Sequence, residues 1–161
     1  MLTIIFLILA FIFSWIRIRK QKSFNRFDLC ECLLTYLIFF NIGCNCILAA
    51  IAHLFFGSTT IEAIGWVPKS PFQIEIAVAN LSFGILGITS LWRKGGFKTA
   101  VLWGWSIFTL GAFIGHAIQQ IYASDGASLD FGIFVWLDEF AIPVFLIGLY
   151  LFRFRVTNQR S

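Results

Sequence analysis

The sequence is dominated by five apolar runs, each long enough, or nearly so, to cross a lipid bilayer as a helix. The runs are continuous and lack the alternation of a membrane β-strand. Only 12% of the residues are charged, against about 25% in an ordinary soluble domain, which excludes a soluble fold. In lipid a single segment satisfies its own backbone hydrogen bonds only as a helix. The runs lie at about residues 2–18, 31–56, 72–92, 99–122 and 131–152.

This pattern predicts an all-α integral membrane protein with a single transmembrane domain over residues 1–161. We expect a bundle of five transmembrane helices, consisting of a four-helix core and a peripheral N-terminal helix. The first run is the weakest, but its basic residues, RIRKQK, follow the run instead of preceding it as in a signal peptide. We therefore expect the first helix to be retained in the membrane.

Basic residues mark one side of the predicted bundle. All Lys and Arg except Lys69 lie at or beside the connections that join runs one and two and runs three and four, or at the C-terminal end. The positive-inside rule then predicts an outside N-terminus and a cytoplasmic C-terminus, in the cytoplasmic (inner) membrane. The net charge of +4 thus comes from basic residues that flank the apolar runs and set the membrane topology. No nucleic-acid partner is therefore expected. The expected partners are the lipid bilayer and a small cation or solute.

Polar residues within the runs gather at similar depths. Under the predicted topology, the histidines and the acidic residues deep in the runs fall in the outer half of the bilayer. A polar group in lipid costs several kcal/mol unless it is paired, so such groups usually face the bundle interior. We therefore expect an outward-opening polar cavity lined by helices two to five. Its candidate ligand-binding residues are His53, Glu75, Asn80, His116, Gln120, Asp138 and Glu139.

Some of these residues carry more specific expectations. Asp138 and Glu139 point about 100° apart on an α-helix, so we expect only one to face the cavity. Glu75 and His116 differ in depth by less than about one helical turn, so we expect a proton-sensitive pair. The same two residues with His53 form a candidate metal site, because imidazole and carboxylate ligands suit first-row metals. Hydrogen bonding between helices, or water at the interface, explains each residue equally well.

Glycines recur on two of the predicted helices. Gly84 and Gly87 lie in the third run, and Gly111 and Gly115 form a G-x-x-x-G pattern in the fourth. The G-x-x-x-G pattern lets helices approach closely, so we expect a leucine at Gly115 to damage folding. The same glycine-rich faces also suit a homo-oligomer, although contacts within one chain explain them as well.

Two stretches carry a resemblance to a family. IGWVPKSPFQIEIAVANL, at residues 64–81, and GHAIQ, at residues 115–119, resemble an uncharacterised family of small prokaryotic multi-helix integral membrane proteins. The likeness covers about residues 45–150 and leaves out the first helix. It implies a helical membrane fold with His53, Glu75, Asn80 and His116 at signature positions, and it implies no chemistry.

Several functions fit this pattern. The first is binding or transport of a cation, either a proton or a divalent metal, or of a small solute. The second is a non-catalytic partner or scaffold subunit, whose polar residues only lock helices together. A bis-His haem or redox protein would use His53 and His116 as axial ligands. A membrane-embedded enzyme on a lipid-like substrate is disfavoured, because no nucleophile, nucleotide-loop, C-x-x-C or H-E-x-x-H motif is present. The sequence therefore does not identify a cofactor, and it favours a divalent metal over haem.

Overall fold

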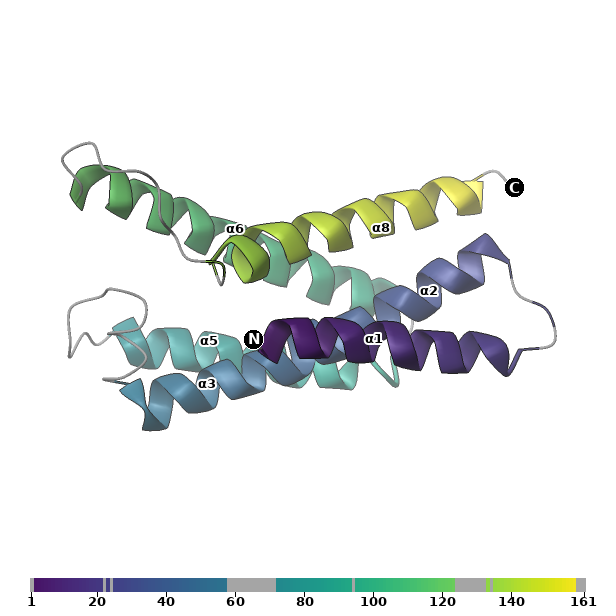
Figure 1. Cartoon of the computed structure of the whole chain (residues 1–161), viewed down its shortest axis with the longest axis horizontal. Helices are drawn as coiled ribbons and strands as arrows, with labels where there is room; N and C mark the ends of the chain where they lie inside the picture. Colours follow the sequence, from purple (N-terminus) through teal and green to yellow (C-terminus); the bar gives the residue numbers. More distant parts are fainter. Residues whose placement is uncertain are drawn as a thin grey trace.

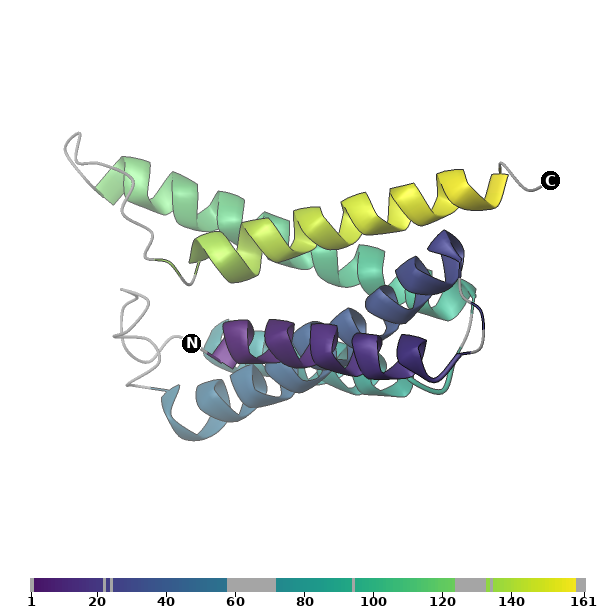
Figure 2. The same cartoon turned by 45° about the vertical axis from the view of Figure 1, so that its right-hand side comes forward.

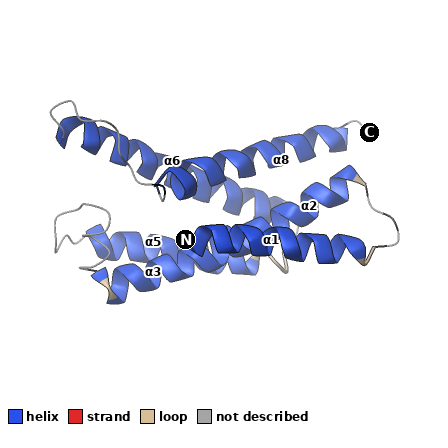
Figure 3. Ribbon diagram, viewed as in Figure 1, coloured by secondary structure: helices blue, strands red, loops and turns tan. Residues whose placement is uncertain are grey.

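The computed structural model describes residues 2–21, 23, 25–57, 72–93, 95–123, 133 and 135–158. These residues form helices and no strand, as Figure 3 shows. Five of the helices are long and apolar enough to cross a membrane. The all-α fold with five membrane-spanning helices, predicted from the apolar runs, is confirmed.

Three spans are single α-helices: α1 (Leu2–Arg19), α5 (Phe72–Thr89) and α6 (Gly96–Ala123). The second span is one continuous helix made of α2 (Arg26–Leu37), η1 (Ile38–Cys44) and α3 (Asn45–Phe55). The fifth span joins η2 (Val135–Ala141) to α8 (Ile142–Asn158). Both η1 and η2 are π-helices, which the sequence did not predict. A π-helical turn inside an α-helix is rare and often marks a functional site.

The second span begins before its apolar run because it is capped. Asn25 accepts a hydrogen bond at 3.0 Å from the backbone N–H of Asp28, and the Asp28 carboxylate accepts one at 3.1 Å from Asn25. This reciprocal capping box satisfies two backbone N–H groups at the helix start. The helix therefore starts at Arg26, outside the apolar stretch predicted to begin near residue 31.

The helices are arranged in two groups that diverge at one end of the bundle (Figures 1 and 2). One group holds α3 and α5 side by side, with α1 lying along α2 and η1. The other group holds α6, which contacts both η2 and α8. From its start near η1, α6 moves away from α5 towards the end of the bundle where α3 ends. This divergence positions the cavity described below.

Glycines bring α5 into backbone contact with the second span. A Cβ atom on Gly87 would lie 2.5 Å from the backbone nitrogen of Gly43, and one on Gly84 would lie 2.7 Å from Cδ1 of Ile47. Real Cβ atoms do not approach other heavy atoms so closely, so only glycine permits this contact. Gly84 and Gly87 thus bring α5 against the second span, and this contact lies within one chain.

An ion cluster joins three helices at the opposite end of the bundle. The Glu31 carboxylate of α2 lies 3.0 Å from the Lys98 ammonium of α6 and 2.7 Å from Nε of Arg153 on α8. Between this cluster and the diverging end lies the buried core of the bundle. Its most buried large side chains include Leu37, Ile38, Ile42, Leu102 and Leu146.

Candidate functional site

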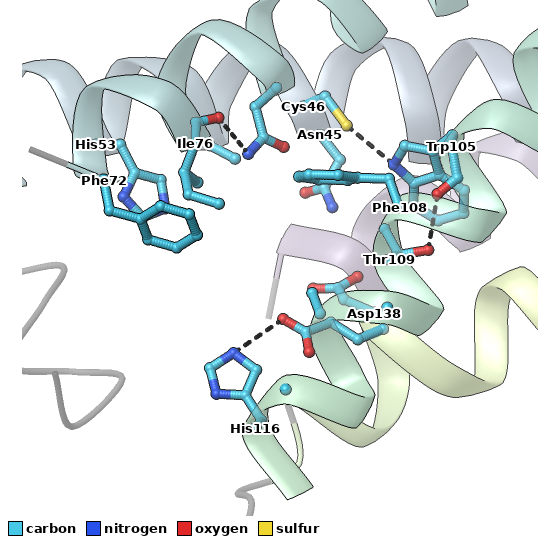
Figure 4. A pocket seen from close by; sticks show the side chains of 16 residues that line it. Asn45, Cys46, His53, Phe72, Ile76, Trp105, Phe108, Thr109, His116 and Asp138 are labelled. Carbon is cyan, nitrogen blue, oxygen red and sulfur yellow. Dashed lines mark hydrogen bonds and ion pairs between the residues drawn. The ribbon is translucent and has the colours of Figure 1, made fainter. Parts of the chain in front are cut away.

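A cavity of about 520 Å³ lies between α3, α5, α6 and η2 (Figure 4). It occupies the part of the bundle where α5 and α6 diverge, away from the Glu31 cluster. Small-molecule sites in proteins typically measure about 300–1,000 Å³. The cavity is therefore large enough for a small organic molecule, and much larger than a bare ion requires.

The first wall of the cavity consists of residues of α3 and α5. Phe72, Ile76 and Asn80 follow one another at intervals of four residues, so they share one face of α5. The Asn80 amide nitrogen donates a hydrogen bond at 3.0 Å to the carbonyl of Ile76. His53 and Asn45 face the cavity from α3. Within the described part of the chain, the buried Nδ1 atom of His53 has no hydrogen-bond partner.

The second wall is the face of α6 that carries both aromatic and very small residues. The indole N–H of Trp105 donates to the Cys46 thiol at 3.2 Å, and the Thr109 hydroxyl donates to the carbonyl of Trp105 at 3.0 Å. These bonds fix the deepest polar groups of the wall (Figure 4). The other members of the wall are Phe108, Gly111, Ala112, Gly115 and His116.

The floor of the cavity is η2, which presents two adjacent carboxylates. Asp138 is only 6% exposed and accepts a hydrogen bond at 2.7 Å from the hydroxyl of Thr3 on α1. One oxygen of Glu139 lies 3.4 Å from Nε2 of His116, and its other oxygen, Oε2, is buried without a partner among the described residues. The expectation that only one of the two acids faces the cavity is wrong. A π-helix has more residues per turn than an α-helix, so neighbouring side chains are separated by a smaller angle.

Glu75 does not line the cavity. Its side chain is exposed, because it lies about 100° around α5 from Ile76, on a different face from the Phe72–Asn80 row. The predicted pair of Glu75 with His116 is not formed, and His116 contacts Glu139 instead. The predicted metal set of His53, Glu75 and His116 is not assembled either. Within the described ranges, no three His, Cys, Asp or Glu side chains come close enough together to hold a metal ion.

Five of the seven candidate residues do line this single cavity: His53, Asn80, His116, Asp138 and Glu139. The side chain of Gln120 lies outside the described residues. As Figure 4 shows, His53 and His116 lie on different sides of the cavity. A haem held between them would require His116 to leave Glu139.

The two glycines of the G-x-x-x-G pattern have a different role from the one predicted. Gly111 and Gly115 line the cavity, and a Cβ atom on either would meet no described residue within 4 Å. They therefore make space on the face of α6 and do not bring another helix close. The expectation that a leucine at Gly115 would separate packed helices is wrong.

Sequence reasoning missed the part of the site contributed by α1. Thr3, Ala10, Ser14 and Ile18 are buried in α1. Their spacing of seven, four and four residues is that of one helical face, and three of the four are small or polar. This row was visible in the sequence as a face that packs against protein. Packing of this face brings the Thr3 hydroxyl within hydrogen-bonding distance of the Asp138 carboxylate.

Comparison with known proteins shows the family. A family of unknown function, DUF6790, matches residues 1–159, and the chain belongs to it. The match includes the first helix, which the resemblance drawn from the sequence left out. No curated protein and no solved structure matches the chain. The predicted membership of an uncharacterised family is thus confirmed, and the chemistry must be argued from the site.

Proposed function

We propose that the protein binds a small solute in the cavity between α3, α5, α6 and η2, and that the solute reaches the cavity from outside the cell. The observation that carries this proposal is a pair of buried polar atoms without partners among the described residues. They are Nδ1 of His53 on one wall and Oε2 of Glu139 on the floor. Buried polar atoms are nearly always hydrogen-bonded, so each such atom needs a partner outside the described residues, and a bound solute would supply one.

The size and chemistry of the lining favour a molecule over a bare metal ion. A first-row metal needs several nitrogen, oxygen or sulfur ligands at close range, and the described residues assemble no such group. The cavity instead combines a few polar groups with an apolar aromatic wall that includes Trp105 and Phe108. That combination is typical of sites for small organic ligands.

The expected side of access follows from topology. His53 and Phe72 lie near the end of α3 and the start of α5, whereas the Glu31 cluster lies at the other end, beside the basic connections. The positive-inside rule puts those connections in the cytoplasm, so the cavity faces outward. The core around Leu37 and Leu102 separates it from the cytoplasmic end.

Reporter fusions test this topology. Fusions after Lys98 and after Ser161 should report a cytoplasmic position, and a fusion after Gly126 should report an external one. A fluorescent protein that folds only inside and a phosphatase that is active only outside provide the two readouts. A cytoplasmic signal after Gly126 would place the cavity on the inner side and would overturn the outward access proposed here.

Filling the cavity tests the binding itself. Gly115→Leu adds a bulky side chain where no described residue lies within 4 Å of a Cβ atom, so the protein should fold while the solute loses its space. Gly148→Leu is the matched control, because Gly148 is also exposed and open to a Cβ atom, yet it lies on α8 outside the cavity lining. Both changes raise helix propensity by about the same amount.

The measurement is the thermal stability of the purified protein in detergent, against a panel of small amines, carboxylates, amino acids and sugars. A bound compound at about 100 times its Kd should raise the melting temperature of the wild type and of Gly148→Leu by about 5 to 10 °C. The melting temperature of Gly115→Leu should not respond. If no compound stabilises the wild type, the scaffold function is favoured instead. If Gly115→Leu responds like its control, the solute does not bind in this cavity.

A further inference from the structure

We infer that the solute is a small organic cation, a positively charged nitrogen group carried on an apolar body. This inference rests on the binding function proposed above and assigns the ligand class to that same cavity. It is drawn from three properties of the lining: its charge, the state of its hydrogen-bond donors, and its aromatic wall.

The charge of the described lining disfavours an anionic ligand. The described residues that line the cavity include Asp138 and Glu139 but no Lys or Arg. Lys98 and Arg153 contact Glu31 at the other end of the bundle. With neutral imidazoles, the lining therefore carries the two carboxylate charges. As long as both carboxylates are ionised and at least one imidazole is neutral, the lining is net negative, which favours a positive ligand group.

Three hydrogen-bond donors of the lining are already used within the protein. The Trp105 indole donates to Cys46, the Thr109 hydroxyl to the carbonyl of Trp105, and one amide N–H of Asn80 to Ile76. The Glu139 Oε2 atom, in contrast, is buried and accepts nothing from the described residues. A cation with N–H groups would supply the donor that this carboxylate oxygen lacks.

The aromatic residues favour an organic cation over an inorganic one. Phe72, Phe108 and Trp105 follow one another along the cavity, from left to right in Figure 4, together with aliphatic groups such as Ile76. Aromatic faces attract cations and also cover the apolar part of a ligand. An alkali or divalent ion has no apolar part for this wall to cover, and it would lack a set of oxygen ligands. A substituted amine of small molecular size uses both the carboxylates and the wall.

The test measures which charge reaches the cavity. Ala112→Cys puts a thiol on the α6 wall, in a Cys46→Ser background that keeps an acceptor for Trp105 and removes the native cavity thiol. Three methanethiosulfonate reagents are then compared: a neutral methyl, a cationic trimethylammonium-ethyl and an anionic sulfonatoethyl compound. Each modification rate is divided by the rate of the same reagent with free 2-mercaptoethanol, which removes intrinsic reactivity. The background without Ala112→Cys gives the contribution of the other native thiols.

We expect the cationic reagent to react at least about tenfold faster than the anionic one, because a cleft lined by one sign of charge concentrates the opposite ion. Glu139→Gln and Asp138→Asn, each made in the same background, should lower this ratio severalfold. They keep the shape of the side chain and remove one negative charge. The rate of the neutral reagent should change little in either variant.

The outcomes separate the two proposals. If the neutral reagent does not modify the introduced thiol, the cavity is closed to solutes, and the binding function falls with the inference. If the neutral and anionic reagents react as fast as the cationic one, binding stands and the organic-cation class is wrong. Ala49→Cys repeats the measurement from the α3 wall, so poor folding of one variant does not decide the result.

Discussion

Replacing Gly87 by alanine should prevent α5 from packing against η1 and should strongly destabilise the bundle. The new Cβ atom would lie 2.5 Å from the backbone nitrogen of Gly43 and 2.6 Å from its Cα atom. A backbone within a helix cannot move aside as a flexible side chain can, so the two helices must separate. Overpacking in a core costs about 1–3 kcal/mol, and this contact falls at the upper end. A loss of about 3 kcal/mol lowers the melting temperature by about 6 to 12 °C.

Gly104→Ala and Gly148→Ala are the controls for this effect. A Cβ atom on Gly104 would meet only a ring carbon of Phe83, at an ordinary 3.5 Å, and one on Gly148 would meet nothing within 4 Å. Both variants should melt at or slightly above the wild-type temperature, since alanine favours the helix. The melting curve in detergent is the measurement. If Gly87→Ala melts together with these controls, the backbone contact between α5 and η1 does not exist.

The helices themselves could be predicted from the sequence because one physical requirement dominates them. A segment that crosses lipid must be long, apolar and internally hydrogen-bonded, and each of these properties is visible in the sequence. The π-helices could not be predicted in the same way. Gly43 lies inside η1 and Pro143 follows η2 by two residues, but glycines also occur in α5 and α6, which stay α-helical throughout. For this reason the orientation of Asp138 and Glu139 was predicted incorrectly.

The candidate site shows the same division between depth and direction. Counting residues from the helix ends gives the depth of a side chain, and this correctly gathered His53, Asn80 and His116 around one cavity. The same count says nothing about the face of the helix on which a residue lies. Glu75 is close in sequence to Asn80 but points away from the cavity. The partner of His116 therefore depends on helix rotation, which only the structure provides.

The second large effect is expected at the opposite end of the bundle. Glu31→Gln should destabilise the protein, because it leaves Lys98 and Arg153 close together without a counter-charge. The side chains of Lys98, Arg153 and Glu31 are 13%, 22% and 29% exposed, so water screens these charges only in part. Removing one partner of a fully buried pair costs about 3–5 kcal/mol, and exposed pairs contribute about 0–1 kcal/mol. For this cluster we expect a loss of about 2 kcal/mol, or about 4 to 8 °C in melting temperature.

A double-mutant cycle shows whether the loss comes from this ion cluster. Lys98→Met removes one of the two unpaired cations, so the Glu31→Gln/Lys98→Met double variant should be more stable than the sum of the single changes predicts. The excess should shrink at high salt, since added ions screen the repulsion that remains in Glu31→Gln. Arg93→Gln is the control, because it removes an exposed basic charge at the same end of the bundle and should leave the melting temperature unchanged. Strict additivity of Glu31→Gln and Lys98→Met would show that the cluster does not join α2 to α6.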